Sequence, residues 1–203
     1  MAVPAATSSR ILTIPNLVTF IRLIGVGVFW WVILVEENIV MGAWLIFLIG
    51  WTDWIDGYLA RRLNQVSDLG KALDPIADRL MIVSAVVGGL IVGVVPGWIG
   101  IPLLLREVIM AVVALVLIAR GGGTLPVRKL GKWATFIIYG AIPAFYLAGA
   151  DVWHDLFLFL GWVFGLIGLV LYWYVLFQYI GDARHRLSAV ESTSTATSRI
   201  EEN

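Results

Sequence analysis

Long apolar runs separated by short polar breaks dominate the chain. We count six runs, at about residues 16–35, 39–61, 72–95, 98–119, 132–149 and 153–180. Most are near the length of about 20 residues that a helix needs to cross a bilayer, and the last is long enough to tilt or to extend into water. The pattern predicts an all-α integral membrane protein with six transmembrane helices.

The two ends of the chain differ in character from the runs. Residues 1–9 are mostly small and neutral to polar, and residues 188–203 are rich in Ser and Thr. Segments that cannot bury apolar surface are typically disordered. We therefore expect a disordered N-terminus over 1–10, a six-helix transmembrane domain over 11–187 and a disordered polar tail over 188–203.

The distribution of basic residues predicts the orientation. The breaks after the first, third and fifth runs contain no Lys or Arg, whereas the opposite ends of the helices carry many. The positive-inside rule therefore places both termini at the cytoplasmic side of a bacterial-type inner or plasma membrane. Arg106 is the exception, because it lies well inside the fourth run.

Composition limits the possible partners. The chain is 60% hydrophobic and has a formal net charge of zero, so membrane lipids are expected partners and nucleic acid is not. It has no cysteine, and His154 and His185 lie far in sequence from the aspartates at residues 53–78, so a zinc site is not expected.

Four aspartates stand out in and beside the second and third runs, where carboxylates are costly. Asp53 and Asp56 share one helix face, and Asp74 and Asp78 share another, because residues three or four apart are neighbours on a helix. The few residues between the two segments allow an antiparallel pair whose acidic faces meet. Clustered carboxylates need a compensating cation, and hard oxygen ligands suit Mg²⁺, Mn²⁺ or Ca²⁺.

Together these residues form the pattern D-x-x-D-G-x-x-A-R, eight residues, G-x-x-x-D-x-x-x-D over residues 53–78. The pattern resembles the signature of the CDP-alcohol phosphotransferase (phosphatidyltransferase) family, and every fixed position is filled. Within the family, the chain resembles phosphatidylglycerol-phosphate synthases and actinobacterial-type cardiolipin synthases. The fixed positions are Asp53, Asp56, Gly57, Ala60, Arg61, Gly70, Asp74 and Asp78.

The resemblance implies a metal-dependent enzyme of phospholipid biosynthesis, with a polar cavity open to the cytoplasmic side. It would move a phosphatidyl group from CDP-diacylglycerol to an alcohol and release CMP, using two divalent cations, Mg²⁺ or Mn²⁺. Asp78 would act as catalytic base or as a further metal ligand, and a homodimer is expected. The implied metal ligands are Asp53, Asp56, Asp74 and Asp78, and the implied CDP-lipid site is Gly57, Ala60, Arg61, Gly70 and Asn16.

Asn16 follows Pro15 at the entry to the first run, as in family members that make phosphatidylglycerol phosphate. Contact with the nucleotide is one interpretation of Asn16. The other is that Asn16 and Arg22 only mark a segment at the membrane interface.

Four further basic residues are candidates for acceptor binding: Arg106, Arg128, Lys129 and Lys132. Arg106 would line the polar cavity or form a structural pair with Glu107. The other three lie in or just after the glycine-rich break near residue 125, where contact with anionic lipid is the alternative. Gly131-Lys132-Trp133-Ala134-Thr135 resembles the Gly-Lys-x-Lys-Thr of phosphatidylglycerol-phosphate synthases, except that Ala134 replaces the second lysine.

The acceptor alcohol stays open at this point. Glycerol 3-phosphate is the leading acceptor, because a phosphate-bearing acceptor matches the cytoplasmic surplus of cations, and the product would be phosphatidylglycerol phosphate. Phosphatidylglycerol, which would give cardiolipin, is second and is favoured by Ala134, and inositol phosphate is third. A cation-binding transporter and a purely structural polar network are the non-enzymatic alternatives. A transporter should have polar residues on both sides of the midplane, whereas the acids here crowd toward one side.

Overall fold

The computed structural model describes residues 14–50, 68–123, 125 and 128–201. These residues form helices and turns, and the described part of the chain contains no strand. The helices are α1 (Ile14–Leu34), a segment Ile39–Gly50, α3 (Asp68–Ile91), α4 (Gly97–Ala119), α5 (Lys129–Gly149) and α6 (His154–Glu201).

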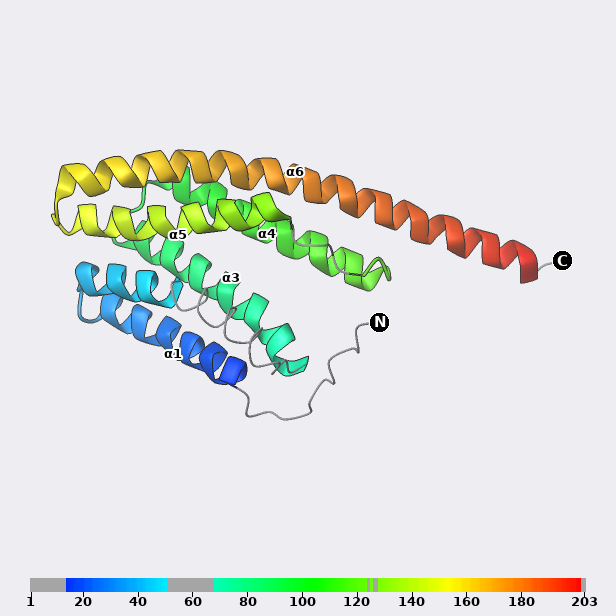
Figure 1. Ribbon diagram of the computed structural model, residues 1–203, viewed down its shortest axis with the longest axis horizontal. Coiled ribbons are helices and arrows are strands. Elements are labelled where there is room, and N and C mark those ends of the chain that lie inside the picture. Colours follow the sequence, from blue (N-terminus) through cyan, green and yellow to red (C-terminus); the bar gives the residue numbers. More distant parts are fainter. Residues whose placement is uncertain (1–13, 51–67, 124, 126–127, 202–203) are drawn as a thin grey trace, which may run out of the picture.

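Successive described helices run in alternating directions, so the connections gather at two ends of the bundle (Figure 1). The turns 35–38, 92–96 and 150–153 lie at one end. Residues 120–123, which follow α4, and Arg128, which precedes α5, lie at the other end, where α3 begins and where α6 leaves the bundle. Residues 51–61 of the second run lie outside the described residues, so the number of six transmembrane helices stays a prediction.

The core forms where the helices bury their apolar faces against one another. Helices α5 and α6 lie side by side along most of the length of α5, and α4 packs against α6. The indole rings of Trp98 and Trp162 stack with centroids 4.5 Å apart between α4 and α6. Two hydrogen bonds fix α3, one from the Tyr146 hydroxyl to the Ala85 carbonyl (2.8 Å) and one from Trp30 Nε1 to Ser84 Oγ (3.2 Å).

Glycines in the left-handed region end two of the helices. Helix α3 ends at Ile91, before the expected residue 95, because Gly93 adopts a φ of +75° and turns the chain toward Pro96. Gly121 and Gly123, with φ of +71° and +70°, end α4 in the same way. A residue with a side chain rarely adopts this conformation, so the glycines position the connection between α4 and α5.

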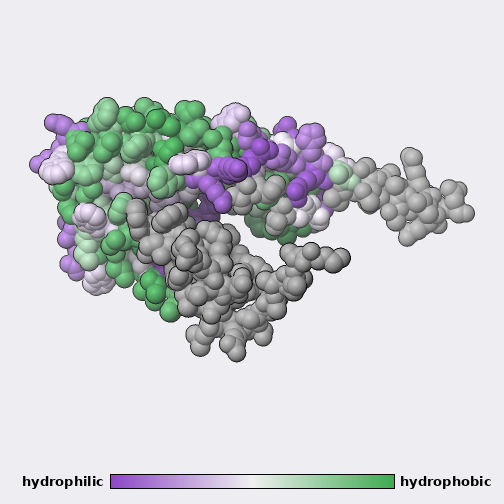
Figure 2. Space-filling model, viewed as in Figure 1, coloured by the Kyte–Doolittle hydropathy of each residue, from purple (hydrophilic) through white to green (hydrophobic). Residues whose placement is uncertain are grey.

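Three described helices are long and apolar enough to cross a membrane: α4, α5 and the part of α6 from His154 to Ala189. Thr19–Leu34 and Ile39–Gly50 are shorter apolar helices. Large apolar side chains face outward, as at Leu115 (66% exposed) and Val170 (68%). Figure 2 shows hydrophobic surface over much of the bundle and hydrophilic residues where α6 leaves it. Such outward apolar surface is typical of a chain embedded in lipid.

The C-terminal segment differs from the sequence-based expectation. Residues 188–203 are expected to be a disordered tail, but α6 continues as one helix to Glu201. The stretch after Gly181 contains neither Gly nor Pro. Extending an existing helix needs only one residue to be fixed at a time, so polar residues continue α6 without a new nucleation step. The assignment of 1–10, 11–187 and 188–203 as domain and flanking segments otherwise stays a prediction.

Candidate active site

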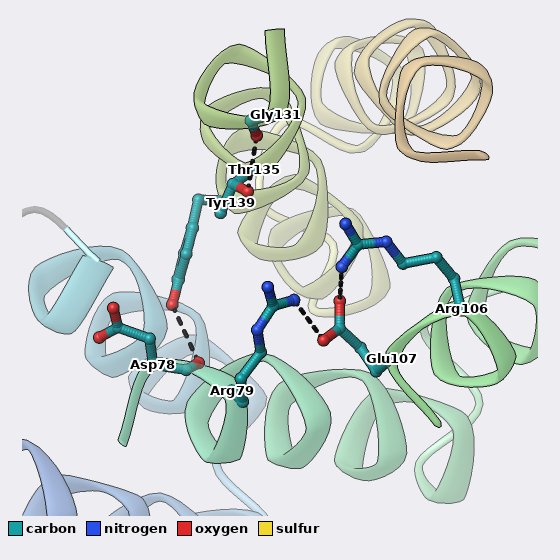
Figure 3. A network of polar contacts seen from close by, with 7 residues as sticks. All are labelled: Asp78, Arg79, Arg106, Glu107, Gly131, Thr135 and Tyr139. Atoms are coloured by element: carbon teal, nitrogen blue, oxygen red, sulfur yellow. Dashed lines mark hydrogen bonds and ion pairs between the residues drawn. The ribbon is translucent and has the colours of Figure 1, made fainter. Parts of the chain in front are cut away.

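A network of charged side chains crosses the middle of the bundle (Figure 3). Its first part joins α1 to α3, where Nη1 of Arg22 donates to Oδ1 of Asp78. Arg22 is buried (4% exposed), whereas the Asp78 side chain is 36% exposed. The candidate base is therefore held by a buried cation and is still accessible from one side.

The second part of the network joins α3 to α4 through one carboxylate. Nη1 of Arg79 donates to Oε2 of Glu107, and Nη1 of Arg106 donates to Oε1 of the same carboxylate at 2.8 Å. Figure 3 shows Asp78 and Arg79 leaving α3 in different directions, with Arg79 turned toward Glu107. Consecutive helix residues diverge by about 100°, which explains why two neighbours in sequence serve two separate ion pairs.

Aromatic side chains from α5 and α6 complete the network. The guanidinium carbon of Arg106 lies 4.0 Å from the ring centroid of Tyr172, a cation–π contact. The Tyr139 hydroxyl lies 3.5 Å from the carbonyl oxygen of Asp78, to which it donates. All five labelled helices thus contribute to one site.

Burial makes the Arg106–Glu107 pair costly to disturb. The two side chains are 3% and 6% exposed, so neither charge is well solvated. Removing one partner of a buried pair typically costs about 3–5 kcal/mol, because the other charge is left uncompensated. Among the described residues, Nε of Arg106 is also buried without a hydrogen-bond partner. Nε of Arg106 is therefore a donor in this network that the described side chains do not satisfy.

The structure reaches only part of the expected metal and CDP-lipid site. Asp53, Asp56, Gly57, Ala60 and Arg61 lie outside the described residues. Gly70 and Asp74 lie on the described backbone of α3, which places Asp74 one helical turn before Asp78, and Asn16 lies in the first turn of α1. No group of three metal-binding side chains occurs within the described ranges.

The candidate acceptor residues fall into two groups. Arg106 belongs to the buried network, whereas Arg128, Lys129 and Lys132 lie at the start of α5. Arg128 is held by α6, because its Nη2 lies 2.5 Å and its Nε 3.1 Å from Oδ2 of Asp182. A further bond joins Nη1 of Arg128 to Oε1 of Gln178 at 3.1 Å. Lys129 and Lys132 are exposed.

The sequence pattern does not assign Arg79, Tyr172 or Tyr139 to the site, and it leaves Arg22 open between a role at the entry to the first run and a position that only marks the membrane interface. A signal for Arg79 is present, since a charged residue inside an apolar run is rarely without a partner. Tyr172 and Tyr139 carry no such signal. In the sequence, these two tyrosines cannot be distinguished from the Tyr and Trp residues that commonly lie at the membrane–water interface.

Within the described residues, a helical bundle with apolar outer faces holds a network of charged side chains between its helices. The family model described as CDP-alcohol phosphatidyltransferase matches residues 12–175, most of the chain. The chain therefore belongs to the CDP-alcohol phosphatidyltransferase family, whose members are integral membrane enzymes of phospholipid biosynthesis.

Relatives in this family divide between two activities. The chain is 38% identical to the cardiolipin synthase (CMP-forming) of Streptomyces coelicolor, over 90% of this chain and 87% of the relative. It is 37% identical to a putative cardiolipin synthase of Mycobacterium tuberculosis, over 83% of this chain and 81% of the relative. It is also 33% identical to the CDP-diacylglycerol–glycerol-3-phosphate 3-phosphatidyltransferase of Bacillus subtilis, over 64% of this chain and 75% of the relative.

Proposed function

We propose that this protein transfers a phosphatidyl group from CDP-diacylglycerol to phosphatidylglycerol, forming cardiolipin and CMP. The observation that carries the choice of acceptor is Ala134, which replaces the second lysine of the Gly-Lys-x-Lys-Thr pattern and is fully buried in α5. This position offers no cation to a second phosphate charge. The relatives named cardiolipin synthase, which match more of the chain than the glycerol-3-phosphate enzyme, support the same choice.

In this proposal the donor binds at the N-terminal half of α3 and the segment before it. Gly57, Ala60 and Gly70 let the cytidine and its phosphates approach the helices, because these residues have little or no side chain. Arg61 holds the diphosphate with a planar cation suited to phosphate oxygens. Asn16 contacts the nucleotide from the start of α1.

The reaction is a displacement at phosphorus. The free hydroxyl of the acceptor attacks the phosphorus that bears diacylglycerol, and Asp78 takes the hydroxyl proton as the new P–O bond forms. The bond from that phosphorus to the bridging oxygen breaks, and the oxygen leaves with CMP. Asp78 is suited to this role because its carboxylate is partly exposed and Arg22 holds it in position.

The donor set fits a pair of divalent cations. Asp53, Asp56, Asp74 and Asp78 offer only hard carboxylate oxygens, which are the ligands that Mg²⁺ and Mn²⁺ prefer. When bound, such cations supply charge neutralisation for the diphosphate and for the leaving oxygen. The one-turn spacing of Asp74 and Asp78 on α3 supports a shared site.

Glycerol 3-phosphate is the second candidate acceptor, and Lys132 favours it. Lys129 and Lys132 are exposed in the first turns of α5, where the helix also presents free backbone N–H groups. Such a combination attracts a small soluble phosphate. Inositol phosphate would use the same cations.

Purified protein in detergent, supplied with CDP-diacylglycerol, Mg²⁺ and each acceptor in turn, tests the choice. We expect cardiolipin from phosphatidylglycerol, with at most a minor product from glycerol 3-phosphate. Lipid chromatography separates the products, and CMP release measures the total transfer. If phosphatidylglycerol phosphate is the main product, the proposed acceptor is wrong, but the transfer of a phosphatidyl group from CDP-diacylglycerol still holds.

We further propose that both termini and the acidic stretch face the cytoplasm, and that the protein is a homodimer. Arg120, Arg128, Lys129 and Lys132 lie where α4 ends and α5 begins, at one end of the bundle (Figure 1), and this clustering of basic residues supports the orientation; the homodimer follows from the family resemblance alone.

Single cysteines test the orientation, and the chain has none of its own. Cysteines at Glu36, Gly97 and Asp155 should react with an impermeant thiol reagent in intact cells. Cysteines at Arg120 and Ser188 should react only after the membrane is opened. The reverse labelling pattern would refute the orientation.

A further inference from the structure

We infer that Glu107 is a positioning residue that holds Arg79 and Arg106 as a pair of guanidiniums for the phosphate of the acceptor. The inference rests on the proposed function, since it assigns a place to the acceptor's charge. It adds Arg79, Glu107 and Tyr172 to a region of the site where the sequence indicates only Arg106.

The two oxygens of Glu107 are divided between two helices. Oε2 accepts from Arg79 of α3, and Oε1 accepts from Arg106 of α4. Each described contact uses only Nη1 of the guanidinium, and a guanidinium carries five N–H donors in all. One carboxylate thus fixes the direction of both cations while other donors stay available for a ligand. Nε of Arg106, buried and without a hydrogen-bond partner within the described ranges, is one of them.

The net charge of the unit formed by Arg79, Arg106 and Glu107 also favours the binding of an anion. Within the described residues, the two guanidiniums and the Glu107 carboxylate carry one net positive charge; Arg106 and Glu107 are buried, and the Arg79 side chain is 46% exposed. Arg22 is already paired with Asp78 and so adds no net charge. A phosphodiester with a single negative charge would match this net charge, and the partial burial of the three side chains strengthens the attraction because charges are screened less there than in water. Phosphatidylglycerol carries such a phosphodiester.

Access to the unit is from the side of Asp78. The Arg79 side chain is 46% exposed, and Asp78, the neighbouring residue in sequence, is 36% exposed. The phosphate of phosphatidylglycerol and its free hydroxyl are separated by one glycerol unit. An acceptor phosphate at Arg79 therefore keeps the attacking hydroxyl in the neighbourhood of the proposed base.

Tyr172 packs against Arg106, the more deeply buried of the two arginines. Its ring is fully buried, with the guanidinium carbon of Arg106 4.0 Å from the centroid. The ring face limits the guanidinium to one orientation, with its edge toward Glu107, as Figure 3 shows for the arginine and the glutamate. The inference therefore assigns the ring, and not the hydroxyl, to the support of Arg106.

The test measures donor and acceptor kinetics separately, with the purified full chain in mixed micelles. Glu107→Gln keeps the shape of the side chain and removes its charge. We expect the KM for phosphatidylglycerol to rise about tenfold to a hundredfold, because charge-assisted contacts direct both guanidiniums. The KM for CDP-diacylglycerol should stay within about twofold. Arg79→Gln should show the same split between the two substrates.

Glu36→Gln is the matched control, since it makes the same chemical change at an exposed position in the turn at the far end of the bundle. It should change neither KM. If Glu107→Gln lowers turnover but leaves both KM values unchanged, Glu107 is only structural and the inference is wrong. A lower acceptor KM would contradict it equally.

Tyr172 provides a second test that does not depend on the folding of Glu107→Gln. Tyr172→Phe keeps the ring and should leave the acceptor KM near that of the wild type. Tyr172→Leu removes the ring and should raise it severalfold. Equal effects of Phe and Leu, or no effect of either, would overturn the support role.

A wrong acceptor in the proposed function can be distinguished from a wrong inference about Glu107. If the wild type uses glycerol 3-phosphate instead, the proposed function loses its acceptor. The same variants then decide the inference through the KM for glycerol 3-phosphate.

Discussion

Replacing Asp78 with asparagine should lower turnover by about 10²–10⁴, the usual contribution of a general base. Asparagine has the same shape and can still accept a hydrogen bond from Arg22 through its amide oxygen. It cannot take the proton of the attacking hydroxyl. The variant should therefore fold and assemble as the wild type does, and lose catalysis. Release of CMP from CDP-diacylglycerol in the presence of phosphatidylglycerol measures the effect.

The binding of CDP-diacylglycerol to the Asp78→Asn variant shows whether Asp78 acts as a base or only maintains the structure of the site. We expect CDP-diacylglycerol to stabilise Asp78→Asn against heating to nearly the same extent as it stabilises the wild type. Asp74→Asn, one turn earlier on α3, should lose turnover and metal affinity together. A nearly normal rate in Asp78→Asn would mean that another group takes the proton, or that none is required.

Removal of divalent cations should abolish the reaction completely. In the proposed function the donor carries a diphosphate, and four aspartates would line the site that receives it. Two like charges about 4 Å apart repel by roughly 4 kcal/mol at an effective dielectric constant of about 20, or about a thousandfold in binding per pair. Without cations, the aspartates and the diphosphate cannot share the site.

Dialysis against EDTA followed by addition of single metals tests this expectation. Mg²⁺ or Mn²⁺ should restore turnover, and EDTA already saturated with Mg²⁺ is the control for the chelator itself. The absence of cysteine from the chain gives Zn²⁺ no thiolate ligand. Full turnover in the stripped protein would exclude the two-cation interpretation.

The helical architecture could be predicted because hydrophobicity and helix length are local properties. Runs 98–119 and 132–149 correspond closely to α4 and α5, since the glycines and Pro96 that bound them act on the backbone directly. The third run was predicted too long. Its apolar residues continue past Ile91, and only the left-handed φ of Gly93 shows that the helix has ended. Hydrophobicity alone does not encode that turn.

The site could be predicted less completely. The Asp53 to Asp78 pattern identified the family because its chemistry depends on fixed spacings within two helices. Arg79, Glu107 and Tyr172 come from three helices, and their meeting depends on how α3, α4 and α6 pack. The sequence left Arg106–Glu107 open between a structural pair and a cavity lining. The bridge from Glu107 to Arg79 could not be anticipated, since neighbours on one helix do not reveal a partner on another.

Helix α6 has a practical consequence for imaging. It is one unbroken helix of 48 residues, and at about 1.5 Å per residue it is roughly 70 Å long. It continues past the end of the bundle (Figure 1), and an ion pair between Arg128 and Asp182 holds it to the start of α5. A helical fusion partner joined in phase after Ser188 would therefore inherit a fixed orientation. Such a rigid fiducial would give this 22.4 kDa protein the added mass and shape that particle alignment in electron cryomicroscopy requires.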